Sequence, residues 1–124
     1  MYKILVVDDD RIIGEMLKFM LSSKGYFALI SNRPEETTRN IIDHKIDLVI
    51  LDQFIFGVSG MNVCKQLKEN ESTGHVPVLM MSADISVAEM CLAAGASDFM
   101  AKPFEMKTLF SKIEAILKET NPSK

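Results

Sequence analysis

Short, uniformly apolar runs recur along the chain, and the rest of the sequence is organised around the run at residues 47–52. It reads Asp-Leu-Val-Ile-Leu-Asp. Four consecutive apolar residues are too few for a buried helix, and they lack the alternation of a strand with one wet face. Such a run is typical of a strand that is covered on both faces in a parallel sheet. We therefore expect a buried strand that ends at Asp52.

Four further segments have the composition of strands. Residues 4–7 and 78–81 are as continuously apolar as residues 48–51, which predicts two more strands buried on both faces, over 3–7 and 78–81. Residues 26–30 and a shorter segment around 99–101 predict two further strands.

Apolar residues at helical spacing fill the segments between these strands. The first helix is expected to stop at Gly25, a residue suited to the left-handed position after a helix. Further helices are expected over about 34–44, 61–68, 86–94 and 105–118, with Ser59 as the N-cap of the third. The predicted inward-facing residues are Ile13, Met16, Leu17, Met20, Leu21, Ile41, Ile42, Val63, Cys64, Leu67, Leu109, Phe110, Ile113, Ile116 and Leu117.

A strand followed by a helix thus occurs five times, which predicts an α/β fold. Right-handed crossovers would place the helices on both faces of one parallel sheet. The 124 residues, with 48% hydrophobic and 25% charged residues, match a single ordinary domain spanning residues 1–124.

Charge and composition exclude several function classes. The 14 basic and 17 acidic residues give a net charge of -3, which argues against direct contact with nucleic acid. No apolar run approaches the ~20 residues that span a bilayer, and no signal-peptide pattern precedes Asp8, so we expect a cytoplasmic protein without a membrane segment. Cys64 and Cys91 are expected to be reduced, part-buried thiols, and His44 and His75 to lie on the surface.

Polar residues follow four of the predicted strands. Asp8 and Asp9 follow the first, Asp52 ends the central one, and Ser82 and Lys102 follow the last two. A strand-terminal Asp often does no more than open a turn. However, the carboxyl ends of parallel strands meet at one edge of a sheet, so we expect these five side chains to lie together.

Carboxylates crowded at one edge repel one another unless a cation is shared among them. A hard divalent ion with oxygen ligands relieves this repulsion most simply, and Mg²⁺ is the natural candidate. Asp52 could then act as a nucleophile toward a phosphoryl group, while Lys102 and the Ser82 hydroxyl hold the phosphoryl oxygens.

Together these residues resemble the receiver domain of two-component response regulators, and the resemblance extends from Ile4 to Leu117. It implies a flavodoxin-like, doubly wound, five-stranded parallel sheet of order 2-1-3-4-5 with five helices. The matching segments are residues 4–10, 47–52, Gly60, 76–83, 94–96 and 102–104.

The resemblance also implies a function and a set of roles. Asp52 would accept a phosphoryl group from the phosphohistidine of a sensor histidine kinase or a histidine phosphotransfer protein, and Ser82 and Lys102 would assist. Asp9 and Asp52 would bind Mg²⁺ directly, Asp8 through water, and Phe54 through its backbone carbonyl. Such a domain is a signalling module rather than an enzyme. It controls an output domain or a downstream protein, and it can form a phosphorylation-dependent dimer.

The chain departs from the family pattern after the phosphoacceptor. The family usually has a proline in the loop where this chain has Gln53-Phe54-Ile55-Phe56, and the span from Ser82 to Lys102 is about two residues shorter than usual. The bond between Lys102 and Pro103 is similar to one that is cis in the family. Phe99 stands at an aromatic position that could be either a conformational switch or a core residue.

Three alternative functions differ in how well they fit. A phosphatase of the haloacid dehalogenase kind would need a second Asp where Phe54 stands, and a flavodoxin's phosphate would be repelled by residues 8–10. A pseudo-receiver, which keeps the fold as an interaction module without phosphorylation, stays open.

Overall fold

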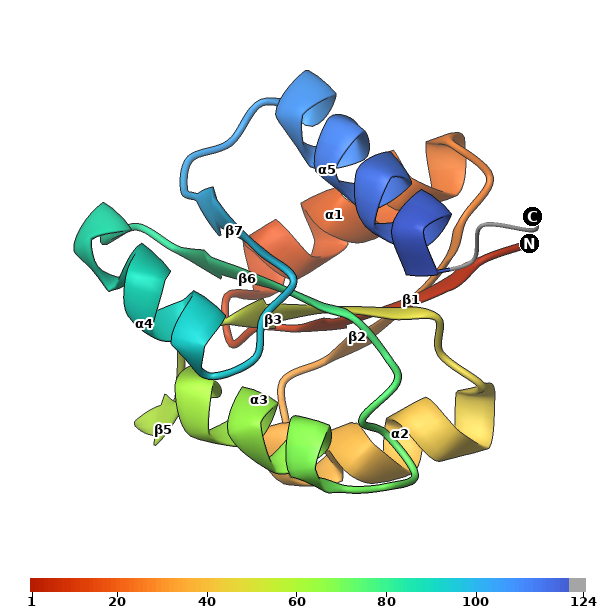
Figure 1. Ribbon diagram of the computed structural model, residues 1–124. Coiled ribbons are helices and arrows are strands. Elements are labelled where there is room, and N and C mark those ends of the chain that lie inside the picture. The colour runs from red at the N-terminus through yellow and green to blue at the C-terminus, as the bar shows by residue number, and fades with distance from the viewer. Residues whose placement is uncertain (121–124) are drawn as a thin grey trace.

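The structure is a computed structural model that describes residues 1–120, and it is built on one parallel sheet of five strands (Figure 1). Its elements, in chain order, are β1 (Lys3–Val7), α1 (Arg11–Ser23), β2 (Phe27–Ser31), the 3-10 turn η1 (Pro34–Glu36), α2 (Thr37–His44), β3 (Leu48–Asp52), β4 (Phe54–Ile55), β5 (Val58–Ser59), α3 (Gly60–Glu69), β6 (Val78–Ser82), the 3-10 turn η2 (Ile85–Val87), α4 (Ala88–Ala93), β7 (Asp98–Ala101) and α5 (Met106–Thr120).

The strand order confirms the predicted doubly wound sheet. The five strands lie in the order β2-β1-β3-β6-β7, which is 2-1-3-4-5 when only the strands of this sheet are counted. All four pairings are parallel. The remaining two strands, β4 and β5, form a small antiparallel hairpin where the sequence predicted only a loop.

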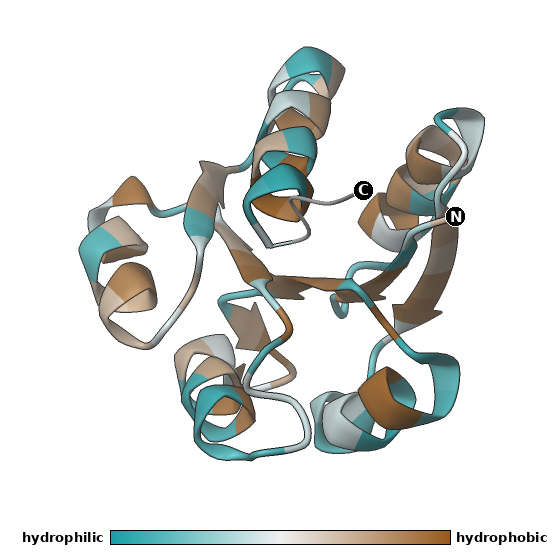
Figure 2. Cartoon of the chain, turned by 45° about the vertical axis from the view of Figure 1, so that its right-hand side comes forward, coloured by the Kyte–Doolittle hydropathy of each residue, from teal (hydrophilic) through white to brown (hydrophobic). Residues whose placement is uncertain are grey.

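Alternate residues of the central strands supply two separate hydrophobic cores. Ile50 of β3 faces the core under α1 and α5, while its neighbour Leu51 faces the core under α2, α3 and α4. The same alternation holds along β1 and β6, as expected for strands covered on both faces. Figure 2 shows the apolar sheet between helices whose outer surfaces are mostly hydrophilic.

The ends of the first helix follow local rules. Asp10 caps the N-terminus of α1, because its carboxylate accepts hydrogen bonds from the backbone N–H groups of Ile12 and Ile13. Gly25 follows the last turn with φ of 85°, the left-handed conformation that the sequence predicted for it.

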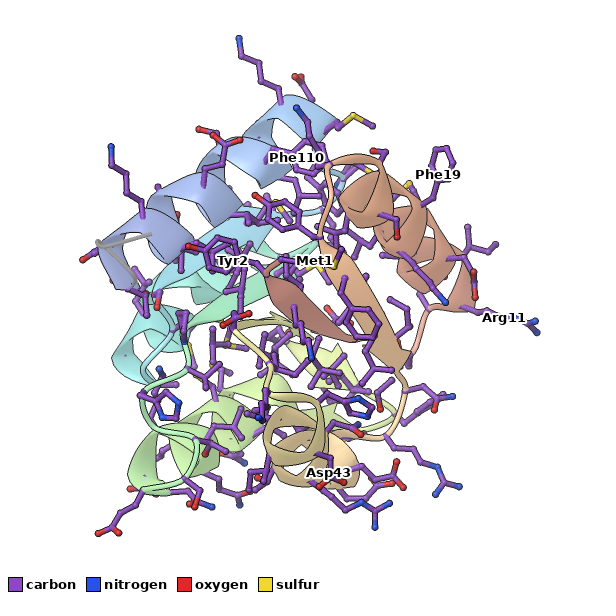
Figure 3. The ribbon with its side chains drawn as sticks, turned by 90° about the vertical axis from the view of Figure 1, so that its right-hand side faces the viewer. Met1, Tyr2, Arg11, Phe19, Asp43 and Phe110 are labelled. Carbon is purple, nitrogen blue, oxygen red and sulfur yellow. The ribbon has the colours of Figure 1, made fainter. Side chains whose placement is uncertain are left out.

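The prediction that Met16 and Ile42 face the core is wrong. Met16 of α1 is 44% exposed and Ile42 of α2 is 50% exposed. In α1, the side of the helix that faces the core is narrower than its apolar pattern suggested. Leu17, Met20 and Leu21 already cover the sheet there, so Met16 lies outside the core. Met16 instead shares an exposed apolar surface with Ile12 and Phe19, and Figure 3 shows Phe19 pointing away from the molecule.

Other predictions differ from the structure only at element boundaries. The segment predicted as one helix from Pro34 begins as the 3-10 turn η1, and β2 lies one residue later than predicted. The polar tail was expected from Glu119, but α5 continues to Thr120, and the rest of that tail lies outside the described residues. Ser59 caps α3 as predicted.

The isolated histidines lie at the surface as expected, but the two cysteines, expected to be part-buried, are fully buried. Both thiols are free and buried, and burial raises the pKa of Cys64 to about 11. His44 and His75 are exposed. Within residues 1–120, no helix is both long enough and apolar enough to cross a membrane.

Candidate functional site

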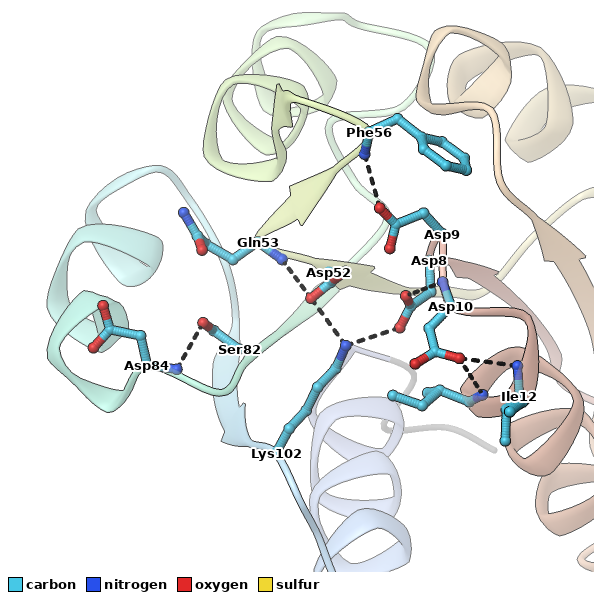
Figure 4. Close-up of polar contacts among 11 residues, drawn as sticks. Asp8, Asp9, Asp10, Ile12, Asp52, Gln53, Phe56, Ser82, Asp84 and Lys102 are labelled. Carbon is cyan, nitrogen blue, oxygen red and sulfur yellow. Dashed lines mark hydrogen bonds and ion pairs between the residues drawn. The ribbon is translucent and has the colours of Figure 1, made fainter.

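The carboxyl ends of four strands bring the predicted site residues to one edge of the sheet (Figure 4). The sheet pairing continues to the last residue of each strand: Asp52 pairs with Met81, and Ser82 pairs with Ala101. Backbone hydrogen bonds extend this order beyond the strands, since the N–H of Lys102 donates to the carbonyl of Ser82 at 2.9 Å. The positions of these residues are therefore fixed by the sheet.

Three carboxylates gather at the centre of this edge. One oxygen from each of Asp8, Asp9 and Asp52 lies within 4.8 Å of the others. Asp8 is 2% exposed and Asp52 is 8% exposed, so water screens their charges poorly. A cluster of hard oxygen donors with this spacing fits a divalent cation such as Mg²⁺.

Lys102 bridges two of the three carboxylates. Its Nζ atom lies 3.0 Å from Oδ2 of Asp8 and 3.1 Å from Oδ1 of Asp52. Burial alone would lower the pKa of Lys102, but the hydrogen bond to Asp8 and the charges of both carboxylates outweigh burial, and the pKa is raised. The lysine therefore stays positively charged at this edge.

Asp52 differs from an ordinary aspartate in its proton affinity. Its pKa is raised, first by burial and then by the negative charge of Asp8, and Lys102 offsets only part of this effect. Its Oδ1 atom also accepts a hydrogen bond from the N–H of Gln53 at 3.0 Å. Burial and the charge of Asp8 together outweigh the stabilisation that Lys102 gives to the ionised Asp52 carboxylate.

Ser82 lies at the same edge, but its hydroxyl is engaged locally. Its Oγ atom accepts a hydrogen bond from the N–H of Asp84 at 3.0 Å (Figure 4). The Asp84 carboxylate accepts hydrogen bonds from both the side chain and the backbone N–H of Ser86, which lower the pKa of Asp84. Asp84 therefore acts as the N-cap of η2.

The segment after Asp52 is held closely against the end of β3. The N–H of Gly60 donates to the carbonyl of Gln53 at 2.7 Å, and a Cβ atom at Gly60 would clash with the backbone carbonyl oxygen of Asp52. Only glycine fits at this close approach. Phe54, the predicted carbonyl ligand, is the first residue of β4, and its side chain is 57% exposed.

Two contributions to this edge were not predicted from the sequence. Asp10 was grouped with the acids but serves as the cap of α1, a role that its place just before an apolar periodic segment could have revealed. The N–H of Phe56 donates to Oδ2 of Asp9 at 2.9 Å across 47 positions in the sequence. No local sequence pattern signals that second contact.

Two further expectations can be compared with the structure. The peptide bond between Lys102 and Pro103 is cis, which confirms the expectation taken from the resemblance. Phe99 is half-buried and packs against the core under α2, α3 and α4. This packing is consistent with the core role that was considered for Phe99.

Comparison with known proteins agrees with this geometry. The family model of the response regulator receiver domain matches residues 4–114. The chain therefore belongs to the response regulator receiver domain family.

Several characterised sequences and structures are similar to the chain. The phosphate regulon transcriptional regulatory protein PhoB of Pseudomonas aeruginosa is 34% identical over 121 residues, which cover 96% of this chain and 53% of PhoB. Response regulator MprA of Mycobacterium leprae is 37% identical over 123 residues, which cover 97% of this chain and 53% of MprA. The chain thus spans about half the length of these relatives.

The structural comparison gives the same fold. The crystal structure of a putative response regulator from Chloroflexus aurantiacus superposes with a TM-score of 0.87 at 34% identity, covering 94% of this chain and 97% of that one. A CheY-like receiver domain protein from Methanospirillum hungatei superposes with a TM-score of 0.88 at 24% identity, covering 100% and 99%, and shares the fold.

Proposed function

We propose that this receiver domain accepts a phosphoryl group on Asp52 in a Mg²⁺-dependent reaction. The observation that carries the proposal is the juxtaposition of three carboxylates with Lys102, which contacts Asp8 and Asp52 at 3.0 and 3.1 Å. The donor would be the phosphohistidine of a sensor histidine kinase or a histidine phosphotransfer protein. That donor class fits because a carboxylate nucleophile needs an activated phosphoryl group.

In the proposed step, a carboxylate oxygen of Asp52 attacks the phosphorus atom. An O–P bond forms as the P–N bond of the phosphohistidine breaks, and the bonding electron pair leaves with the imidazole nitrogen. Because the transferred group spreads negative charge over its oxygens, positive groups must already be in place around it. Lys102 is such a group, and its ion pairs hold its Nζ atom beside Asp52.

The residues at this edge fit a magnesium ion. Asp9 and Asp52 would bind it directly, Asp8 through water, and Phe54 through its backbone carbonyl, giving the oxygen-only ligand set that Mg²⁺ prefers. When bound, the ion neutralises charge on the carboxylates and on the phosphoryl oxygens.

Ser82 and Lys102 have different tasks in this proposal. Lys102 forms an ion pair with a phosphoryl oxygen, for which a compact point charge is well suited. The Ser82 hydroxyl donates a hydrogen bond to another phosphoryl oxygen, while its oxygen keeps the bond from Asp84 N–H. This contact can draw in the segment around η2 and thereby change the surface of the domain.

The domain would act as a switch rather than as an enzyme with an external product. Its altered surface would control an output domain or a downstream protein, and it could support a phosphorylation-dependent dimer. We propose cytoplasmic operation without membrane insertion or direct nucleic acid contact by this domain. A net charge of -3 supports the last point.

Intact-mass spectrometry after incubation with a small phosphodonor and Mg²⁺ tests the proposal. The expected result is a gain of one phosphoryl group, absent in Asp52→Asn and absent when Mg²⁺ is chelated. The pseudo-receiver alternative predicts no gain under any of these conditions. Persistence of the modification in Asp52→Asn at the wild-type level would show that Asp52 is not the acceptor.

A further inference from the structure

The turn at the tip of the β4–β5 hairpin has an unusual residue in a restricted conformation. Phe56 and Gly57 connect the two strands, with φ of 47° and 79°. A two-residue hairpin turn of this kind requires positive φ at both central positions, which favours Asn, Asp or Gly. Phe56 therefore adopts a backbone conformation that its bulky side chain disfavours.

The side chain of Phe56 does not account for this conformation. It is 65% exposed, so burial of the ring cannot fix the turn. The base of the hairpin is anchored separately, by the fully buried side chain of Ile55 and by the hydrogen bond from Gly60 to Gln53. What holds the tip is the hydrogen bond from the Phe56 N–H to the Asp9 carboxylate, at 2.9 Å.

Each of the three carboxylates at the edge accepts hydrogen bonds from a different set of donors. Asp8 accepts hydrogen bonds from the N–H of Asp10 and from Lys102, and Asp52 accepts them from Gln53 and Lys102. Within residues 1–120, Asp9 is paired with no cation, and its hydrogen-bond donor is the backbone of Phe56. Figure 4 shows the Asp9 carboxylate between the hairpin tip and the other acids.

We propose that the hairpin turn positions Asp9 for the divalent ion, with Phe56 acting through its backbone N–H rather than through its ring. The inference rests on the proposed metal-dependent function and assigns a positioning residue to that site. The N–H engages Oδ2, which orients the carboxylate and leaves Oδ1 to bind the ion. Hydrogen bonds from such outer partners set the orientation of metal ligands generally.

The hydrogen bond between the Phe56 N–H and Asp9 depends on the missing proline in the loop after Asp52. In the family that this chain resembles, the proline of this loop is the fourth residue after the phosphoacceptor, where this chain has Phe56, and proline has no N–H to donate. A proline at position 56 could therefore not make the contact with Asp9 that the Phe56 N–H makes. Because binding equilibria are reciprocal, an ion on Asp9 would in turn stabilise the left-handed turn.

Titration of the unphosphorylated protein with Mn²⁺ alone, followed by the loss of the free-ion signal in electron paramagnetic resonance, tests the inference. Phe56→Val keeps the N–H but has a β-branched side chain that strongly disfavours positive φ. We expect about a tenfold loss of Mn²⁺ affinity, as is typical when an outer partner of a metal ligand is removed. Phe56→Asn, which favours the turn, should restore wild-type affinity.

Two further variants show whether a loss of Mn²⁺ affinity comes from the turn conformation rather than from the loss of a phenyl ring or from misfolding. Phe19→Val makes the same substitution at a 75% exposed position on α1 and should bind Mn²⁺ like the wild type. Gly57→Val disrupts the same turn independently, since φ is 79° there and no atom lies within 4 Å of an added Cβ. It should lower the affinity as Phe56→Val does, and it replaces Phe56→Val if that variant does not fold.

The outcomes distinguish this inference from the proposed function. If Phe56→Val and Gly57→Val bind Mn²⁺ as tightly as the wild type, the positioning role is wrong while the metal site stands. If Phe56→Asn loses affinity as much as Phe56→Val, the ring rather than the turn is responsible, and the inference also fails. If the wild type binds no Mn²⁺, both this inference and the metal dependence of the proposed function are wrong.

Discussion

The interior of the sheet and its carboxyl edge contribute differently to stability, and β3 runs through both. In β3, the apolar residues from Leu48 to Leu51 are 0% exposed and stabilise the fold by burial. The next residue, Asp52, is also buried, but it lies beside two other carboxylates and has a raised pKa. The apolar residues of β3 thus stabilise the fold, whereas the ionised carboxylate of its last residue, Asp52, destabilises it. The proposed chemistry thus lies where the fold is electrostatically least favourable.

The largest effect is expected in the interior. Ile50→Ala should lower the free energy of unfolding by about 2 to 5 kcal/mol, because it removes buried methyl groups and leaves a cavity in the core under α1 and α5. Denaturant titration measures this loss. The matched control is Ile12→Ala, at a residue that is 80% exposed, where the change should stay within about 0.5 kcal/mol. Equal losses in the two variants would contradict the assigned core.

At the edge, removing the bridging cation should have the next largest effect. Without divalent ions, Lys102→Ala should lower the free energy of unfolding by about 3 kcal/mol, because Asp8 and Asp52 are left buried without a counter-charge. Its Mg²⁺ affinity should be equal or slightly higher, since a competing cation is gone, while phosphorylation or the response to it is impaired.

A second ion pair with the same distance provides the control for Lys102→Ala. Lys112 lies 3.0 Å from Asp98, but the two side chains are 29% and 40% exposed. Lys112→Ala should therefore cost less than about 1 kcal/mol, because water screens this pair. If Lys102→Ala instead abolished Mg²⁺ binding, the division of tasks between lysine and metal would be wrong.

The same contrast explains what the sequence could predict. Uniformly apolar strands such as residues 48–51 are recognisable because burial on both faces constrains every position, and their polar last residues then locate the edge. Met16 and Ile42 were misassigned because apolar identity does not show which flank of a helix is covered. The β4–β5 hairpin was missed because Phe56 is atypical for its turn and because its partner, Asp9, is 47 positions away.

The lifetime of the phosphorylated state should show a smaller effect. Phe54 has no group that can orient a water molecule, and the Asp84 carboxylate is held by Ser86. We therefore expect slow autodephosphorylation, and Phe54→Asn should accelerate it by lowering the barrier by about 1 to 2 kcal/mol if one water contact is gained. The decay of Asp52 phosphate after donor removal, at fixed Mg²⁺ and pH, measures this. A decay in Phe54→Asn that is no faster than in the wild type would exclude Phe54 from this role.

The smallest effect concerns Asp52 itself in the absence of metal. Because its pKa is raised by folding, the native state binds more protons than the unfolded state between the ordinary value of 3.8 and the raised value. Stability should therefore fall as pH rises through that window, and the cost is fully present above it. Asp52→Asn removes this cost at neutral pH and should therefore raise the free energy of unfolding.

The free energy of unfolding of wild type and Asp52→Asn at pH 7, measured with a chelator and then with saturating Mg²⁺, tests most directly whether this edge is built for a cation. With the chelator, Asp52→Asn should be the more stable protein. With Mg²⁺ at about 100 times its dissociation constant, the wild type should gain about 2.7 kcal/mol, and Asp52→Asn should gain less, so the stability advantage of Asp52→Asn should shrink. A wild type that is already the more stable protein in the chelator, and that gains nothing from Mg²⁺, would contradict the assignment of Asp52 to a metal-dependent phosphoacceptor site.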